Sequence, residues 1–206
     1  MTDCFAALDE ARRPWIDPEA LKAKFLSLST DAHPDRLHNA TEDQKRSATA
    51  HCAELNAAYS CLRDPKERLF HLLTLERGAK PEPVQRIGPE AAGFFDEVSQ
   101  ICGKADTFLA EYAKTTSPLL KAKLLMQSAE LRDVLSGLRH RLLAKRDALV
   151  EQTKALNLAW ESAPAVGSSS RVNFLPCGRL EHLYRDLSYF CRWLIQIEER
   201  LVRLSA

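Results

Sequence analysis

The stretch "STDAHPDRLHNATEDQ", residues 29 to 44, carries a His-Pro-Asp tripeptide at 33–35 between two segments with helical periodicity. Before it, Asp17 and Pro18 have the pattern of an N-cap followed by a proline at the first helical position. Apolar residues then recur at helical spacing until Pro34, which cannot continue the helix and also pushes the preceding residue out of the α conformation. The tripeptide is therefore expected in a loop between two helices.

A second helix is predicted directly after this loop. Thr41 and Gln44 have the spacing of a capping box, in which each side chain bonds the backbone of the other residue. Asp64 and Pro65 then repeat the cap-plus-proline signal and start a shorter helix, which stops at Gly78. With a short apolar start at the N-terminus, we expect a four-helix unit whose second and third helices are long and antiparallel.

The rest of the chain predicts a separate helical domain. Residues 79–88 are rich in proline and glycine and show no periodicity, so they are interpreted as a linker after a first domain at 1–78. Helices are then expected at 89–113, from Ser117 to about Glu161, and at 179–204. We expect them to close as an antiparallel three-helix bundle over residues 89–206, which gives an all-α protein of two domains.

The long middle helix carries a near-heptad apolar stripe, made of Leu124, Leu131, Leu135, Leu138, Leu142, Leu149 and Leu156. Gly137 is its expected weak point, because glycine destabilises a helix interior. A flexible connection is expected at 163–178, which contains the Gly167–Ser170 stretch.

The composition narrows the function classes. The 206 residues carry a net charge of +1, which offers no broad field for nucleic acid or anionic lipid. No apolar run approaches the length of a membrane span, and the first residues resemble no secretory or mitochondrial leader. We therefore expect a cytoplasmic protein with no nucleic-acid or membrane partner.

The six cysteines contain no C-x-x-C pair and are interpreted as reduced, mostly buried, small hydrophobic residues. A metal site around His51 and Cys52 is disfavoured, because adjacent residues on a helix point away from each other. We expect neither a metal site nor a cofactor.

The tripeptide itself has three interpretations. Catalysis is disfavoured, because His33 and Asp35 straddle a proline and no nucleophile is placed beside them, so we expect that the chain is not an enzyme. A plain turn needs no further role, since proline and aspartate are common turn residues. A recognition tip between two helices is the third interpretation, and its helical setting favours it.

In this setting, residues 3 to 76 resemble a J domain, whose hallmark is His-Pro-Asp between its second and third helices. The stretch "AELNAAYSCLRDPKERLFHLLTLERG", residues 53 to 78, further resembles the HscB co-chaperones of iron–sulfur cluster assembly. The positions that fit the HscB pattern are Asn56, Ala58, Tyr59, Leu62, Arg63, Pro65, Leu72, Leu73 and Gly78. A three-helix C-terminal bundle also fits that family.

The resemblance implies docking on the ATP-bound form of a heat-shock chaperone of the HscA or DnaK type, whose ATP hydrolysis it would promote. It assigns the chaperone contacts to His33, Pro34, Asp35, Arg36, Lys22 and Lys24. Many J domains line the second helix with basic residues, whereas this one reads "FLSLSTDA" from Phe25. Electrostatic steering toward the chaperone is therefore expected to be weak.

The resemblance also implies a client surface for the scaffold protein IscU on the first and last helices of the bundle. It assigns this surface to Phe94, Phe95, Glu97, Val98, Tyr189 and Phe190. Phe94 and Val98 are one turn apart and would form an exposed ridge, while one of Phe94 and Phe95 should be exposed because neighbours cannot both point inward. Ser99 and Cys102 occupy positions where the family tends to have carboxylates.

Two alternatives stay open at this level. The chain could serve a general DnaK with a different client. It could also be a helical scaffold in which the tripeptide is vestigial.

Overall fold

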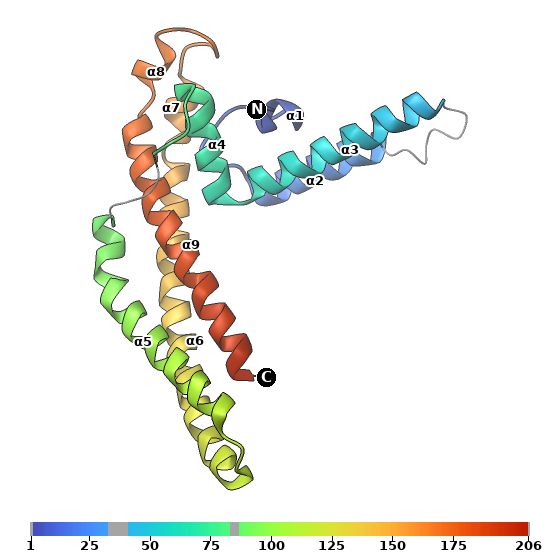
Figure 1. Ribbon diagram of the computed structural model, residues 1–206. Helices are drawn as coiled ribbons and strands as arrows, with labels where there is room; N and C mark the ends of the chain where they lie inside the picture. The colour runs from blue at the N-terminus through green and yellow to red at the C-terminus, as the bar shows by residue number, and fades with distance from the viewer. Residues whose placement is uncertain (1, 33–40, 83–86, 206) are drawn as a thin grey trace. The chain divides into compact units, whose positions relative to one another are not determined.

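The computed structural model describes residues 2–32, 41–82 and 87–205, and this part of the chain forms nine helices and no strand (Figure 1). The expected all-α class is confirmed. The chain divides into two compact units. The first unit comprises Met1–Pro83 and Val150–Tyr184, and the second comprises Val84–Leu149 and Arg185–Ala206. Among the described helices, none combines the length and apolar character needed to cross a membrane.

The N-terminal part of the first unit holds the four expected helices, α1 (Cys4–Ala7), α2 (Pro18–Asp31), α3 (Glu42–Arg63) and α4 (Pro65–Arg77). Their starts follow the caps in the sequence. The Asp17 carboxylate accepts a hydrogen bond from the Ala20 N–H at 2.8 Å. The capping box between Thr41 and Gln44 forms in both directions. Such caps satisfy N–H groups that have no partner within the helix.

Helices α2 and α3 lie side by side and form an antiparallel hairpin (Figure 1). Leu21 on α2 and Leu55 and Leu62 on α3 are buried in the core. The rings of Phe25 and Tyr59 stack with centroids 4.3 Å apart and an interplanar angle of 9°. This apolar seam holds the two helices together at the end of the hairpin away from the tripeptide.

A buried arginine connects α4 to the rest of the four-helix unit. Arg68 donates from Nε to the Pro14 carbonyl at 2.8 Å and from Nη1 to the Leu62 carbonyl at 2.6 Å. Burial lowers the pKa of Arg68 to about 10, and the two carbonyls compensate for part of the lost hydration. The helix ends at Gly78, whose φ of 68° is the left-handed conformation that glycine favours.

The long middle helix ends earlier than expected. Helix α6 (Pro118–Lys154) continues through Gly137 and stops at Lys154, and a separate α7 (Asn157–Glu161) follows. The interruption places Asn157 against the backbone of Trp15, with which its side chain makes two hydrogen bonds at 3.0 and 2.9 Å. A hydrogen bond between residues so distant in sequence produces no periodic pattern, so the sequence did not predict this interruption.

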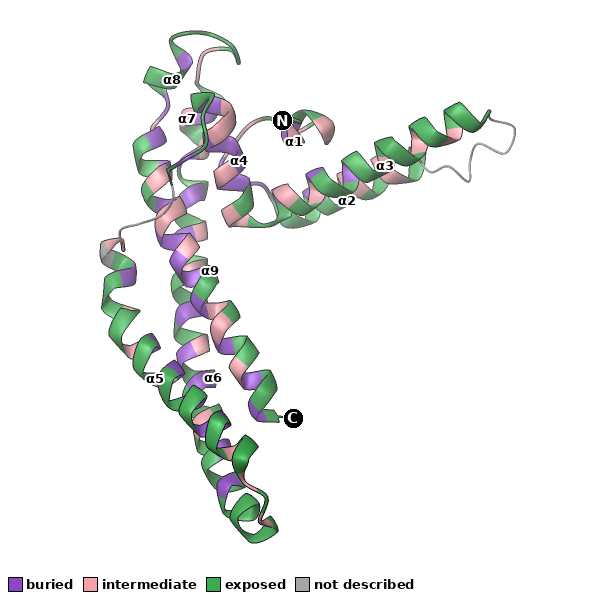
Figure 2. Ribbon diagram, in the orientation of Figure 1, coloured by how far each residue is buried: buried purple, intermediate pink, exposed green. Residues whose placement is uncertain are grey.

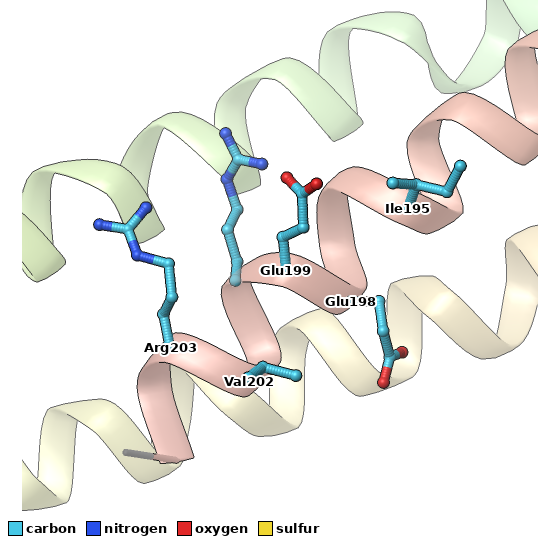
Figure 3. A pocket seen from close by; sticks show the side chains of 6 residues that line it. Ile195, Glu198, Glu199, Val202 and Arg203 are labelled. Atoms are coloured by element: carbon cyan, nitrogen blue, oxygen red, sulfur yellow. The ribbon is translucent and has the colours of Figure 1, made fainter.

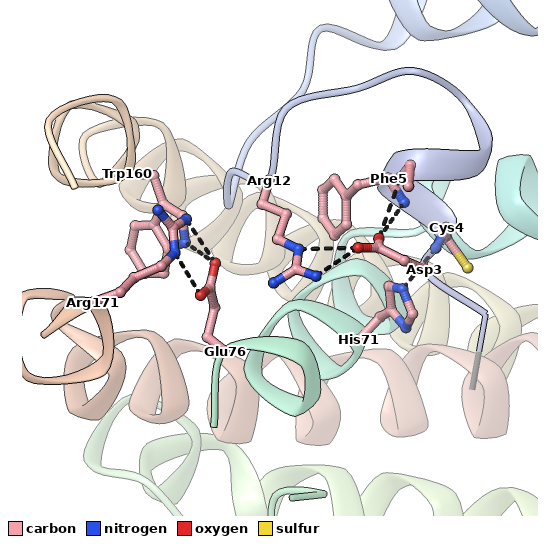
Figure 4. A network of polar contacts seen from close by, with 9 residues as sticks. Asp3, Cys4, Phe5, Arg12, His71, Glu76, Trp160 and Arg171 are labelled. Carbon is pink, nitrogen blue, oxygen red and sulfur yellow. Dashed lines mark hydrogen bonds and ion pairs between the residues drawn. The ribbon is translucent and has the colours of Figure 1, made fainter. Parts of the chain in front are cut away.

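The segment 163–178 differs from the flexible connection expected there. It contains α8 (Arg171–Phe174), and Arg171, Leu175 and Cys177 are buried. The Arg171 guanidinium binds both carboxylate oxygens of Glu76 on α4, at 2.8 and 2.9 Å (Figure 4). Residues 150–184 therefore form one compact unit with the N-terminal helices, whereas the sequence assigned them to the C-terminal domain.

The second unit contains α5 (Pro89–Lys114), α6 as far as Leu149, and α9 (Cys177–Ser205) from Arg185 onward; they form the expected bundle, and their chain directions alternate (Figure 1). Leu135, Leu138 and Leu142 of the predicted stripe are fully buried, as are Phe190 and Ile197 on α9. Figure 2 shows the buried residues recurring along one side of these helices. This spacing is the helical period that the leucine stripe predicted.

Candidate functional site

The residues assigned to the tip of the chaperone-binding loop, His33, Pro34, Asp35 and Arg36, lie outside the described residues. Their flanks are described. Helix α2 ends at Asp31, and the Thr41 cap starts α3. Helices flank the tripeptide on both sides, as predicted, and its role stays a prediction.

Leu26 is an exposed apolar residue on the outer face of α2. The sequence analysis did not identify it. Lys22, Leu26 and Thr30 are all exposed and are spaced four residues apart, so they share one face, named here the α2 face. Leu26 is 52% exposed at its centre. The sequence contained one indication of this exposure, because Leu26 does not follow the helical spacing of Leu21, Phe25 and Leu28.

Lys24, also assigned to the chaperone contact, is bound by groups of its own domain. Its ammonium group donates to the Asp9 carbonyl at 2.7 Å and pairs with the Glu10 carboxylate at 3.0 Å. Glu10 also pairs with Arg13, at 3.0 Å. Lys24 thus fixes the connection between α1 and α2, and Lys22 is the residue that displays its charge on the α2 face.

A groove between α5 and α9 is the second candidate surface. It encloses about 410 Å³ and is lined on α5 by residues from Phe95 to Asp106 and on α9 by residues from Tyr189 to Arg200. Phe95 lies at this groove with 47% of its surface exposed. The prediction that one of Phe94 and Phe95 is exposed is confirmed for Phe95.

The exposed ridge expected from Phe94 and Val98 is wrong. Val98 is only 3% exposed, and Phe94 is half-buried with its ring edge-on to Phe190, centroids 5.8 Å apart. Ala91, Val98 and Ala105 are all buried and recur at intervals of seven residues, so this face of α5 points into the core. The same pattern was present in the sequence.

The other residues assigned to the client surface divide between core and rim. Phe190 is fully buried, and Tyr189 is 9% exposed and lines the groove beside Trp193. Glu97 is half-exposed and is held by both terminal nitrogens of Arg141 on α6. Its carboxylate is therefore neutralised within the bundle.

The charges of the groove include two guanidinium groups. Arg200 donates to the Asp106 carboxylate at 2.6 Å, and Arg192 lies over the Tyr189 ring at 5.6 Å. Ser99 and Cys102 contribute no carboxylate to the same lining. Because Asp106 pairs with Arg200, Arg192 is the cationic group that the groove presents beside its aromatic floor, and an apolar partner segment with a carboxylate for Arg192 fits it best.

A third hollow, of about 570 Å³, lies along the outer side of α9 (Figure 3). Its six lining residues, which include the exposed Ile195 and Val202, all come from this one helix. Figure 3 shows the side chains spread along the helix rather than converging on a point. This hollow is an open helix surface and does not form a binding pocket.

A cluster of possible metal ligands was missed by the sequence analysis. Within the described part of the chain, one sulfur each of Cys4 and Cys61 and one ring nitrogen of His71 lie within 4.8 Å of one another. The Cys61 thiol hydrogen bond lowers the pKa of Cys4 to about 5, and the same bond raises the pKa of Cys61. The three residues are far apart in sequence, so no motif marked them.

Comparison with protein-family models finds no match. In sequence, the chain is 36% identical over 61 residues to a co-chaperone HscB homologue of Shewanella loihica, covering 30% of this chain and 35% of that protein. It is 33% identical over 118 residues to the HscB homologue of Burkholderia cenocepacia, covering 57% and 62% of the two chains. The alignments thus span less than two thirds of these relatives.

Two solved structures share the fold. Chaperone HscB from Vibrio cholerae matches with a TM-score of 0.59 and 17% identity over 96% of each chain. Human co-chaperone HscB matches with a TM-score of 0.59 and 18% identity, over 97% of this chain and 82% of that one. The resemblance to the HscB co-chaperones is confirmed in sequence, and the fold is the all-α fold of these structures.

Proposed function

We propose that this chain acts as an HscB-type co-chaperone. It stimulates ATP hydrolysis by a chaperone of the HscA or DnaK type and delivers a client, the scaffold protein IscU or a relative of it, for iron–sulfur cluster assembly. The observation that carries the proposal is the His-Pro-Asp tripeptide placed between antiparallel α2 and α3, in a chain with HscB-like sequence and fold. This role requires no catalytic group of the chain's own.

The hairpin supports the first step, which is docking on the chaperone. The stacked rings of Phe25 and Tyr59 hold α2 against α3, and the cap at Thr41 defines the start of α3, so these two helices need no rearrangement to present the tripeptide. Pro34 restricts its own φ, and the Asp35 carboxylate is suited to an arginine of the partner. Stimulation follows only if this surface binds the ATP-bound conformation more tightly than the other state.

The α2 face extends the proposed contact along the helix. Lys22 supplies one positive charge and Leu26 one apolar side chain. Because Lys24 is paired with Glu10, fewer charges are available for long-range attraction than its sequence position suggested. Affinity here is therefore proposed to depend more on close apolar contact than on steering.

The groove between α5 and α9 is the proposed client surface. The exposed Phe95 is an aromatic anchor of the kind that dominates protein interfaces. The Arg192 guanidinium beside it favours a partner segment with a carboxylate, whereas Arg200 is already paired with Asp106.

The alternative client assignment rests on these same charges. A groove with arginines and without carboxylates at Ser99 and Cys102 departs from the acidic surface of the family. The chain could therefore serve a general DnaK with a different, acidic client.

The first experiment measures stimulation. Purified HscA and DnaK are each assayed for ATP hydrolysis with the full chain, with His33→Gln and with His38→Gln, a histidine substitution in the same stretch outside the tripeptide. We expect stimulation by the chain and by His38→Gln, and none by His33→Gln, with unchanged melting temperatures. Equal stimulation by His33→Gln and the unaltered chain would contradict the J-domain mechanism.

The second experiment identifies the client. Binding of IscU to the full chain is measured by titration calorimetry, with Phe95→Ala as the variant and Leu158→Ala as a matched exposed apolar control outside the groove. Weakening by the first variant alone supports IscU as client. Stimulation without any IscU binding would leave the general DnaK assignment.

A further inference from the structure

We propose that Cys4, Cys61 and His71 form a binding site for one zinc ion, with the fourth coordination position open to solvent. This site lies within the first unit and shares no residue with the tripeptide or with the lining of the groove. It does not depend on the proposed co-chaperone function.

The distances fit a small displacement on metal binding. The three donor atoms lie within 4.8 Å of one another. In a tetrahedral site with Zn–S of about 2.3 Å and Zn–N of about 2.0 Å, ligand atoms are roughly 3.4 to 3.8 Å apart. Rotation of the two half-buried cysteine side chains can supply this contraction without movement of the helices.

The three donors come from three helices, α1, α3 and α4, and Figure 4 shows Cys4 of α1 beside His71 of α4. At the start of α1, the Asp3 carboxylate accepts from the Phe5 N–H at 3.0 Å and from the Arg12 guanidinium at 2.7 Å. Phe5 is fully buried and stacks on the His71 ring, with centroids 5.9 Å apart. These contacts place Cys4 beside the imidazole.

His71 turns its acceptor nitrogen, Nε2, toward Cys4. Its Nε2 accepts a hydrogen bond from the Cys4 backbone N–H at 3.0 Å, which assigns the ring proton of the neutral form to Nδ1. A zinc ion would have to take this lone pair in place of the Cys4 N–H, so metal binding would break this hydrogen bond. The ring is 5% exposed, so its orientation is fixed by packing, as it is for histidine ligands in known zinc sites.

The surrounding charges favour a cation. Carboxylates of Asp3, Asp64 and Glu67 interact electrostatically with the two thiols, and all of them disfavour a second negative sulfur. The Arg68 guanidinium is the positive group that interacts with Cys61 from α4. A divalent ion would neutralise the two thiolates among these acids, and thiolate with imidazole is a donor set that zinc prefers.

The alternative is a pair of ordinary core thiols. Cys102 and Cys177 have that character, since both are buried and burial raises the pKa of each. Cys4 and Cys61 differ because they are half-buried, adjacent to each other and beside an imidazole. Cys52 is also half-buried but bonds only a backbone carbonyl among the described contacts, which makes it a matched control.

The test uses cobalt as a spectroscopic substitute for zinc. The reduced, metal-free full chain is titrated with Co²⁺ without oxygen, and zinc is then added as competitor. We expect one cobalt per chain, with thiolate-to-cobalt absorption and the intense visible bands of a four-coordinate site. Zinc should abolish both signals and raise the melting temperature of the chain.

The variants locate the site. Cys4→Ser and Cys61→Ser should each weaken cobalt binding more than about 100-fold, because even the outer partners of metal ligands are worth about 10- to 100-fold. Cys52→Ser should bind as the unaltered chain does. Circular dichroism confirms that each variant is folded.

Three results would overturn the proposal. The first is absence of thiolate-to-cobalt absorption in the reduced chain. The second is equal binding by Cys4→Ser and Cys52→Ser. The third is a Cys4–Cys61 disulfide that forms during mild peroxide treatment despite saturating zinc, since zinc-bound thiolates would be protected.

Discussion

Two regions of the first unit, the α2–α3 hairpin and the segment Val150–Tyr184, differ in the sequence separation of the residues that define them. The hairpin is defined by residues close in sequence, such as the caps at Asp17 and Thr41. The segment is held by partners that are 95 and 142 residues away, Glu76 for Arg171 and Trp15 for Asn157. Local signals thus predict the first region, and only the folded chain reveals the second.

The difference has an energetic consequence. The hairpin is held by an apolar seam, whereas the segment has a buried ion pair in addition to its buried apolar side chains. The side chains of Arg171 and Glu76 are only 8% and 2% exposed, and their hydrogen bond raises the pKa of Arg171. Trp160 donates a further hydrogen bond to Glu76, at 3.3 Å. Loss of one member leaves the other groups buried without compensation.

The largest expected effect is therefore that of Arg171→Met. This variant should lose about 3 to 5 kcal/mol of unfolding free energy, because it leaves the Glu76 carboxylate buried and unpaired. Urea unfolding measures the loss.

The control is the double variant Glu76→Gln, Arg171→Met, which should recover much of the stability because no buried charge remains. A single variant as stable as the unaltered chain would show that the segment is not a fixed part of the unit. The fragment 1–78, assigned from the sequence as the first domain, is predicted to be destabilised because Arg171 no longer pairs with Glu76 and Tyr184 no longer packs on Phe70.

The sequence predicted the fold class and the helix starts because caps, prolines and helical periods act over a few residues. It did not predict the site at Cys4, Cys61 and His71, since only packing of three helices brings these residues together. The resemblance assigned Lys24 to the chaperone contact. No sequence pattern marked its acceptors, Asp9 and Glu10, which lie before α2 in the chain. Tertiary contacts of this kind carry no periodic signal.

The exposure predicted for Phe94 and Val98 was wrong for another reason, which is the direction of each side chain around the helix axis. Residues along an α-helix differ by about 100° in direction, so a shift of one position moves a side chain from the rim into the core. The resemblance placed Val98 on the surface, whereas the buried residues of α5 place it inside. Phe95, its neighbour by three positions, faces the groove.

The second prediction uses this contrast between rim and core. Phe95→Ala should weaken client binding by about 2 kcal/mol, because an aromatic anchor is lost, while stability changes by less than about 0.5 kcal/mol. Phe190→Ala should instead lose about 3 to 5 kcal/mol of stability, because it leaves a cavity in the core. Thermal unfolding and client titration on both variants separate the two roles.

A strongly destabilised Phe95→Ala would place this residue in the core and remove it from the client surface. Unchanged client binding with unchanged stability would make the exposure of Phe95 incidental.

The smallest expected effect lies on the α2 face. Leu26→Ser removes an apolar side chain that is 52% exposed, so it should leave the melting temperature unchanged. If the chaperone covers this face, the concentration of chain needed for half-maximal ATPase stimulation should rise about 5-fold, which corresponds to roughly 1 kcal/mol of docking energy. Maximal stimulation should be retained, because the tripeptide is intact.

The matched control is Leu119→Ser, an exposed leucine on α6 in the second unit, which should leave the half-maximal concentration unchanged. Salt dependence sharpens the result. With Lys24 held by Glu10, Lys22 is the charge that the α2 face displays, so raising the ionic strength should weaken docking only slightly. A steep loss of stimulation with salt, together with no effect of Leu26→Ser, would contradict the apolar contact and would instead indicate charged groups in the stretch 33–40 as the main source of affinity.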